Sequence, residues 1–158
     1  MVPNEVRPAG GLDNGQMTDR PLLSSLGVAL RADENVLFAL AFGSTAAGAD
    51  QPSSDVDLLV DLNDPSLDQV LDLTARLEDA TGRRVDLVRL SDAEVDPLFL
   101  ADVLAEGHVL IDRAERWPRL RGRESNLRQR GEQLQAERIR SALAGIDHLL
   151  ERQQWGRS

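Results

Sequence analysis

Apolar residues recur three or four positions apart in several parts of the chain, which predicts amphipathic helices there. This spacing covers residues 20–34 and residues 66–81, and the glycine directly after the second segment is typical of a helix end. Ser91 and Glu94 have the spacing of a capping box, so we expect another helix to begin at Ser91. The longest periodic segment, residues 124–154, predicts a C-terminal helix.

Four apolar stretches are too short for helices and predict strands instead. The run 36–42 is apolar throughout, as in a strand buried on both faces, and Gly43 ends it. The other three stretches are residues 55–61, 84–90 and 108–111. Helices and strands therefore alternate along the chain, which predicts a small α/β (α+β) domain followed by a helical tail.

The same pattern divides the chain into four parts. Residues 1–19 are rich in Gly, Pro, Asn and Asp and have no periodicity, so we expect a disordered leader, with Met17 as an alternative start. Residues 20–112 form the α/β domain, whose length suffices for one hydrophobic core. Residues 113–123 are expected to be an Arg-rich connector and residues 124–158 the C-terminal helix.

Composition excludes several kinds of chemistry. The 158 residues include no cysteine, which excludes disulfides, thiolate metal sites and a cysteine nucleophile. All 18 basic residues are arginine, so Schiff-base chemistry and a P-loop lysine are excluded as well. No apolar run approaches the roughly 20 residues that span a membrane, and no signal peptide is recognisable. We therefore expect a cytoplasmic protein without a membrane partner.

Charge is distributed unevenly along the chain. The net charge is -9, yet 11 of the 18 arginines follow Asp112, whereas 21 of the 27 acidic residues lie at or before it. An acidic body repels polyanions, so strong binding to nucleic acid is not expected. The arginines of the connector could contact RNA or an acidic partner, or simply be solvated. They are Arg113, Arg116, Arg119, Arg121 and Arg123.

Two carboxylates on one predicted strand are the first candidates for a functional site. Asp55 and Asp57 are two residues apart, and side chains at that spacing point to the same face of a strand. Neighbouring carboxylates repel each other unless a cation lies between them. Mg²⁺ that carries a nucleotide phosphate fits such oxygen ligands. The alternative is a solvent-facing strand edge.

Gly43 and Ser44 end the preceding strand and could contact that nucleotide. Glycine lets a ligand approach the backbone closely, and a helix that begins at Ser44 would direct free N–H groups at a phosphate. Asp86 interrupts the apolar strand 84–90 and would add a third carboxylate, if that strand lies beside Asp55 and Asp57. Ser44 could equally be a simple helix cap, and Asp86 a surface residue paired with an arginine.

Gly43-Ser44, ten intervening residues and Asp55-x-Asp57 resemble the signature of the DNA polymerase β-type nucleotidyltransferase superfamily. The fuller pattern Gly-Ser-x-Ala-x-Gly … Ser-Asp-x-Asp-Leu resembles its minimal nucleotidyltransferases (MNT), which are commonly the antitoxins of HEPN–MNT toxin–antitoxin pairs. The resemblance covers about residues 36–111. It implies a small mixed sheet of the nucleotidyltransferase type, flanked by helices.

The resemblance also implies an activity, a partner and a set of site residues. The activity is Mg²⁺-dependent transfer of AMP from ATP to a hydroxyl. In the toxin–antitoxin group the acceptor is a tyrosine of the partner HEPN ribonuclease, which is thereby neutralised within a hetero-oligomer. Asp55, Asp57 and Asp86 would be the catalytic and metal-binding residues, and Gly43 and Ser44 would bind the nucleotide.

The sequence departs from the family pattern at Thr45 and Ala47, where many minimal members carry arginine. A local cation for the triphosphate is therefore missing, and Arg83, Arg84 or Arg89 would have to replace it. Two alternatives stay open: a weak or inactive member that neutralises a toxin by binding alone, and a small-molecule transferase of the aminoglycoside type.

The tail helix has an apolar face of its own. It could fold back on the α/β body, or pair with a partner protein or a second copy of the chain. The face consists of Ile139, Ala142, Leu143, Ile146, Leu149 and Leu150.

Overall fold

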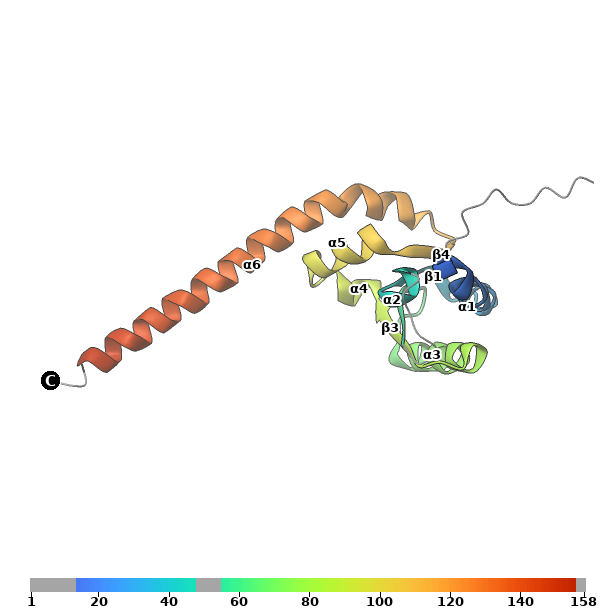
Figure 1. Cartoon of the computed structure of the whole chain (residues 1–158), viewed down its shortest axis with the longest axis horizontal. Helices are drawn as coiled ribbons and strands as arrows, with labels where there is room; N and C mark the ends of the chain where they lie inside the picture. The colour runs from blue at the N-terminus through green and yellow to red at the C-terminus, as the bar shows by residue number, and fades with distance from the viewer. Residues whose placement is uncertain (1–13, 48–54, 156–158) are drawn as a thin grey trace, which may run out of the picture.

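The computed structural model describes residues 14–47 and 55–155. Its helices and strands alternate as the sequence pattern predicts (Figure 1). None of the described helices is long and apolar enough to cross a membrane. In chain order the elements are α1 (Asn14–Arg31), β1 (Val36–Phe42), α2 (Ser44–Ala47), β2 (Val56–Leu62), α3 (Leu67–Thr81), β3 (Val85–Arg89), α4 (Leu90–Ala93), α5 (Pro97–Glu106), β4 (His108–Asp112) and α6 (Arg116–Trp155).

The four strands of the described residues form one mixed sheet in the order β3-β2-β1-β4. β1 pairs antiparallel with both β2 and β4, whereas β2 and β3 are parallel. Parallel neighbours need a long crossover connection, which α3 supplies. The expected α/β domain with a small mixed sheet is therefore confirmed.

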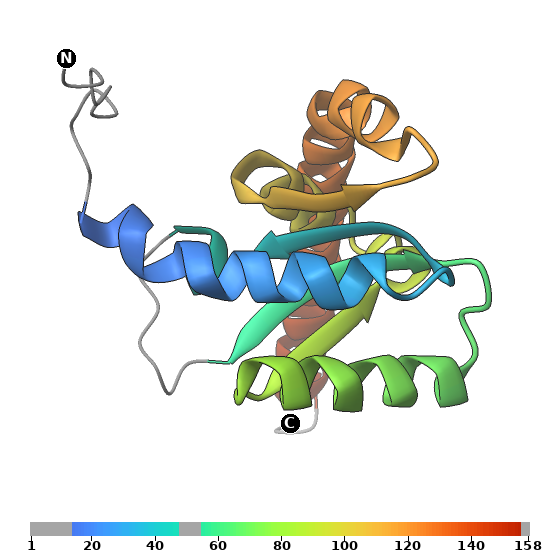
Figure 2. The same cartoon turned by 90° about the vertical axis from the view of Figure 1, so that its right-hand side faces the viewer.

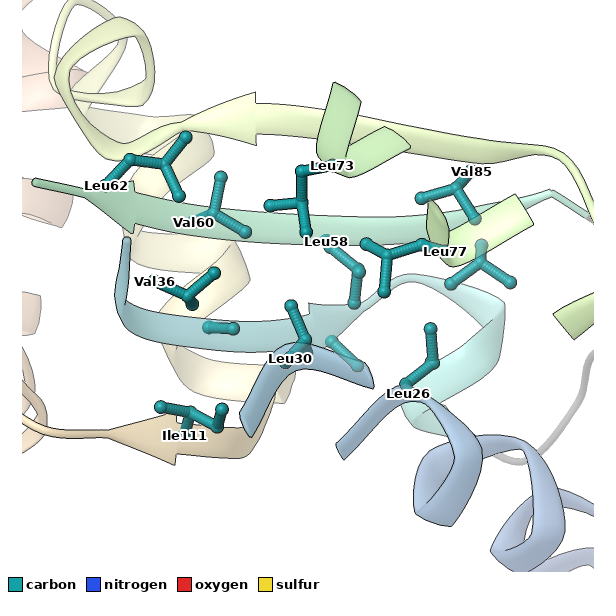
Figure 3. Packing of buried hydrophobic residues seen from close by; sticks show 13 residues of the cluster. Leu26, Leu30, Val36, Leu58, Val60, Leu62, Leu73, Leu77, Val85 and Ile111 are labelled. Atoms are coloured by element: carbon teal, nitrogen blue, oxygen red, sulfur yellow. The ribbon is translucent and has the colours of Figure 1, made fainter. Parts of the chain in front are cut away.

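Helices cover both faces of the sheet, which explains why the central strand β1 is apolar throughout (Figure 2). On one face, Leu26 and Leu30 of α1 and Leu73 and Leu77 of α3 pack on residues such as Leu58 (Figure 3). On the other face, side chains of β1 and β2 pack against α4, α5 and the first half of α6. This second cluster includes Phe38, Leu40, Leu59, Leu100, Leu104, Leu120 and Leu127.

The first helix differs from the sequence prediction at both ends. α1 begins at Asn14, so residues 14–19 of the expected leader are helical, while residues 1–13 lie outside the described part of the chain. Residues 14–20 lack apolar periodicity, and this is why the pattern failed to reveal them. α1 ends at Arg31 because Asp33 instead forms a turn, in which its carboxylate accepts a hydrogen bond from the N–H of Asn35 at 3.0 Å.

The predicted capping box at Ser91 and Glu94 is wrong. α4 has only four residues, begins at Leu90 and has no side-chain cap. The longer helix α5 is capped by Asp96 instead, whose carboxylate accepts a hydrogen bond from the N–H of Phe99 at 3.2 Å. The residue before a proline avoids the helical conformation, so Pro97 separates the two helices and occupies the first turn of the second.

α6 begins at Arg116, so residues 116–123 of the expected connector are helical. Asp112 explains the early start, because its carboxylate accepts hydrogen bonds from the N–H groups of Arg116 and Trp117 at 2.8 and 3.0 Å. Pro118 lies in the first turn, where a missing N–H costs nothing. The first half of α6 packs against α5, and the second half extends beyond the α/β body (Figure 1).

Candidate active site

The sheet register brings two of the three predicted carboxylates together. Asp57 of β2 is the direct neighbour of Asp86 on the parallel strand β3. Strand alternation places both on the sheet face that α4, α5 and α6 cover, since Leu59 of the same strand packs there. Asp55 is exposed and lies immediately before β2, two residues from Asp57. The condition set for Asp86 from the sequence, a strand beside that of Asp57, is therefore met.

The carboxyl of Asp57 is the most perturbed acid of this group. Burial raises its pKa above the ordinary value of 3.8, and the negative charges of Asp86 and then Asp55 raise it further. Phe42 lies directly opposite Asp57 on β1, so the two side chains are on the same face of the sheet. The charges of Asp86 and Asp55 thus both act on Asp57, and a bound cation would relieve this repulsion.

Gly43 lies against this carboxylate. It has a positive φ of 68°, which ends β1 and which side chains other than glycine adopt rarely. A β-carbon at Gly43 would lie 2.7 Å from Oδ2 of Asp57, so the carboxylate would have to move to accommodate one. Ser44 then begins α2, so the helix start that the sequence left as a condition is present, although this helix is a single turn of four residues.

The donor set fits a divalent cation. Within residues 14–47 and 55–155, no three His, Cys, Asp or Glu side chains converge closely enough to hold an ion by themselves. Mg²⁺, however, is usually held by one or two carboxylates, and water and substrate phosphates complete its shell. Asp57 with Asp86, and Asp55 beside them, provide carboxylates of the type and number that such a shell requires.

Sequence reasoning missed an apolar wall beside the carboxylates. Phe42 packs edge-on against Phe99 of α5, with ring centroids 5.7 Å apart and planes at 81°. The apolar pattern predicts Phe42 only as a strand residue, although its position directly before Gly43 is a local signal that it borders the site. Phe99 carries no such signal, because only the packing of α5 brings it to this edge.

The arginines considered as substitutes for the missing local cation differ in their surroundings. Arg89 is occupied away from the carboxylates: its guanidinium bonds to Asp92 at 2.7 Å and to the carbonyl of Pro65 at 2.9 Å. Arg84 is exposed directly before β3, and the described residues show no ion pair between it and Asp86. The side chains of Thr45 and Ala47 lie outside the description.

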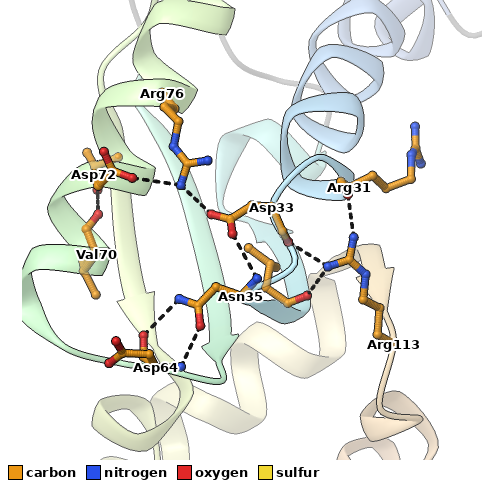
Figure 4. Close-up of polar contacts among 10 residues, drawn as sticks. Arg31, Asp33, Asn35, Asp64, Val70, Asp72, Arg76 and Arg113 are labelled. Carbon is orange, nitrogen blue, oxygen red and sulfur yellow. Dashed lines mark hydrogen bonds and ion pairs between the residues drawn. The ribbon is translucent and has the colours of Figure 1, made fainter.

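Most arginines of the predicted connector bind the chain itself. Arg113 donates to the carbonyl oxygens of Arg31, Asp33 and Val36 and ties the end of β4 to α1 and β1 (Figure 4). Three other arginines lie on the first turns of α6. Arg116 pairs with Asp61, and Arg123 pairs with Glu94 at 3.6 Å. Arg121 lies 5.4 Å from the ring centre of Trp117.

Comparisons with known proteins agree with this arrangement. A model of the family described as "Polymerase beta, Nucleotidyltransferase" matches residues 26–116, which include every residue of the candidate site. A search of curated proteins finds no match for the sequence.

Several solved structures are similar to this chain. A toxin–antitoxin complex with AMP-PNP gives a TM-score of 0.60 at 25% identity, and the match covers 81% of this chain and 98% of that one. The MntA–HepT toxin–antitoxin complex gives 0.53 at 23%, covering 85% and 98%. A tri-AMPylated HEPN toxin of Shewanella oneidensis in complex with MNT antitoxin gives 0.52 at 22%, covering 86% and 98%. At these identities, the last two structures show a similarity of fold alone.

Proposed function

This chain belongs to the polymerase beta nucleotidyltransferase family, and we propose that it is the antitoxin of a HEPN–MNT toxin–antitoxin pair. In this proposal it transfers AMP from ATP to a tyrosine hydroxyl of the partner HEPN ribonuclease and thereby neutralises it. The observation that carries the proposal is the register pairing of Asp57 with Asp86 beside the close approach of Gly43.

The similar structures support the choice of nucleotide and partner. One of them is a toxin–antitoxin complex with AMP-PNP, an ATP analogue. Another contains a tri-AMPylated HEPN toxin together with its MNT antitoxin. The match covers 98% of the similar chain in both structures. We therefore propose ATP as the nucleotide that this chain uses and a HEPN protein as its partner.

In the proposed reaction the acceptor hydroxyl attacks the α-phosphorus of ATP. The bond from this phosphorus to the bridging oxygen breaks, and pyrophosphate leaves. Asp57 and Asp86, with Asp55 beside them, would hold Mg²⁺, which supplies positive charge to the triphosphate and to the departing pyrophosphate. Asp86 is exposed and would take the proton of the hydroxyl. Gly43 leaves its backbone open for the phosphates to approach.

A second candidate function is neutralisation by binding alone. It is favoured by the missing local arginines at Thr45 and Ala47 and by the engagement of Arg89 with Asp92 and Pro65, away from the carboxylates. Under this alternative the chain keeps the fold and the toxin contact but holds the triphosphate too weakly for transfer.

The test uses the chain with the HEPN protein encoded beside it, Mg²⁺ and α-labelled ATP. We expect the label on the partner, and we expect Asp57→Asn to abolish labelling while the two proteins still form a complex. Asp79→Asn is the matched control, since Asp79 is exposed on α3 outside the site. A wild-type chain that binds and silences the partner without labelling it would establish the binding function instead.

A further inference from the structure

The second half of α6 carries an apolar face that nothing in the described part of the chain covers. Its five large aliphatic side chains are between 52% and 59% exposed. In the first half of the same helix, Leu120 and Leu127 are only 4% and 6% exposed because α5 covers them. The exposed side chains are Ile139, Leu143, Ile146, Leu149 and Leu150. From the sequence this face could pack on the α/β body, on a partner protein or on a second copy of the chain. Its exposure in the structure excludes packing on the body.

Four of the five large side chains of this face are arranged symmetrically about a point between Ala144 and Gly145. Leu143 and Ile146 lie at equal distances on either side of that point, and so do Ile139 and Leu150. A second copy that runs in the opposite direction would therefore place Leu143 against Ile146 and Ile139 against Leu150. These contacts make a self-complementary, twofold interface.

The charges along the same segment favour this antiparallel direction. Within residues 137–152, the half before the centre carries Glu137, Arg138 and Arg140, a net charge of +1, whereas the half after it carries Asp147, Glu151 and Arg152, a net charge of -1. Arg140 and Asp147 are seven residues apart, so they lie along one edge of the apolar face. In an antiparallel pair the same edges meet, and each arginine faces the aspartate of the other copy. In a parallel pair this edge would instead face the opposite edge, which carries Ala142 and Leu149, so the arginine and the aspartate would lack a charged partner there.

We propose that residues 137–152 of α6 pair with the same segment of a second copy of this chain as an antiparallel two-helix interface. Ala142, on this face beside the symmetry centre, lets the helices approach closely there. Five half-exposed aliphatic side chains from each copy would remove on the order of 1,000 Å² from water, near the lower limit for a specific interface. The dimer is therefore reversible, and its two α/β bodies lie at opposite ends. The proposal does not depend on nucleotidyl transfer.

The first test is the mass of the full chain without any partner, measured by sedimentation between about 1 and 200 µM, the range expected for a small interface. We expect the dimer fraction to rise with concentration. Leu143→Glu/Ile146→Glu should leave a monomer whose body unfolds at the wild-type Tm. Ser141→Glu, on the opposite side of the helix, should still dimerise. A wild-type monomer throughout this range overturns the proposal, even if the same double variant loses binding to the HEPN protein.

The direction of pairing is tested by crosslinking, which the absence of cysteine makes simple. In the antiparallel pair the two copies of residue 143 are offset by only about 4.5 Å along the axis, whereas the two copies of residue 139 are offset by about 16 Å. Leu143→Cys should therefore crosslink through a short reagent and Ile139→Cys should not. Equal crosslinking of both variants contradicts the antiparallel arrangement. Arg140→Asp should weaken the dimer, and Arg140→Asp/Asp147→Arg should restore it.

Discussion

Gly43 lies so close to Asp57 that a β-carbon on the glycine would be 2.7 Å from Oδ2 of the carboxylate. The glycine also has a positive φ of 68°, which turns the chain from β1 into α2. One residue thus both shapes the turn and leaves the carboxylate accessible. These two roles can be separated because the chain has a second glycine with nearly the same backbone conformation, Gly82, with a φ of 66°.

We predict that Gly43→Ala reduces AMP transfer at least about tenfold, because the new methyl group displaces the carboxylate of Asp57. The variant should also lose about 1 to 2 kcal/mol of unfolding free energy because of its backbone conformation. Gly82→Ala is the control: its β-carbon would meet nothing within 4 Å, so it should lose stability but keep its activity. Labelling rates and urea unfolding of both variants test this, and equal activity losses would contradict it.

A second prediction concerns stability and pH. Since burial and then the charges of Asp86 and Asp55 raise the pKa of Asp57 above 3.8, the folded protein holds its proton to higher pH than the unfolded chain does. The protonated carboxyl therefore stabilises the folded protein fully at pH values below the unfolded pKa of 3.8, and this stabilisation is lost as pH rises through the folded pKa. At neutral pH the ionised carboxylate is therefore destabilising.

Asp57→Asn should consequently unfold at a higher Tm than the wild type at pH 7 without metal, and this gain should vanish toward pH 3.5, below the unfolded value of 3.8. Adding Mg²⁺ with ATP should raise the Tm of the wild type more than that of the variant. Asp79→Asn serves as the exposed control. Thermal unfolding across this pH range is the measurement, and a variant less stable than wild type at pH 7 would refute the prediction.

Local patterns predicted the parts of this fold that depend on neighbours in the sequence. The apolar run of β1 coincides with the strand Val36–Phe42, and the helix that Gly82 ends runs from Leu67 to Thr81. The sequence predicts that Asp57 and Asp86 are neighbours only on the condition that their strands pair. This pairing is parallel and joins strands that are distant in the sequence, so local patterns do not reveal it.

The sequence predictions that were wrong or left open concern features that apolar periodicity alone does not determine. The start of α6 depends on the carboxylate of Asp112, which caps the helix. Asp112 is four residues before the first helical residue, and this spacing is longer than the usual capping spacing. The capping box at Ser91 failed because Pro97 divides the segment into two helices. The exposed face of α6 could not be assigned from periodicity, since a buried and a paired helix show the same apolar spacing.

A third prediction concerns Gly131, which looks like a weak point of α6 by propensity alone. In the structure it is buried against α5, and a β-carbon there would lie 2.7 Å from both the backbone nitrogen and the β-carbon of Leu98. Gly131→Ala should therefore destabilise the protein by about 1 to 3 kcal/mol through overpacking. Gly122→Ala meets nothing within 4 Å and should be neutral or stabilising by up to about 1 kcal/mol. Urea unfolding of the pair tests this, and equal effects would exclude a packing role for Gly131.

The last prediction concerns Arg113, which the sequence grouped with arginines available to RNA or an acidic partner. Its guanidinium donates to the carbonyl oxygens of Asp33 and Val36 at 2.7 and 2.9 Å and to that of Arg31 at 2.6 Å. These carbonyls belong to the end of α1 and the start of β1, so one side chain joins three elements. Hydrogen bonds from charged donors contribute about 1.5 to 3 kcal/mol, and solvent exposure places this site toward the lower end.

Arg113→Ala should accordingly lower the unfolding free energy by about 1 to 2 kcal/mol, as expected for the loss of charged hydrogen bonds at an exposed site. Arg113→Lys should recover only part of this, because one ammonium cannot reproduce the fork that reaches three carbonyls. Arg119→Ala, an exposed arginine three residues into α6, should leave stability unchanged. If Arg113→Ala unfolds like the wild type but loses affinity for RNA or for the HEPN protein, the arginine serves a partner and not the fold.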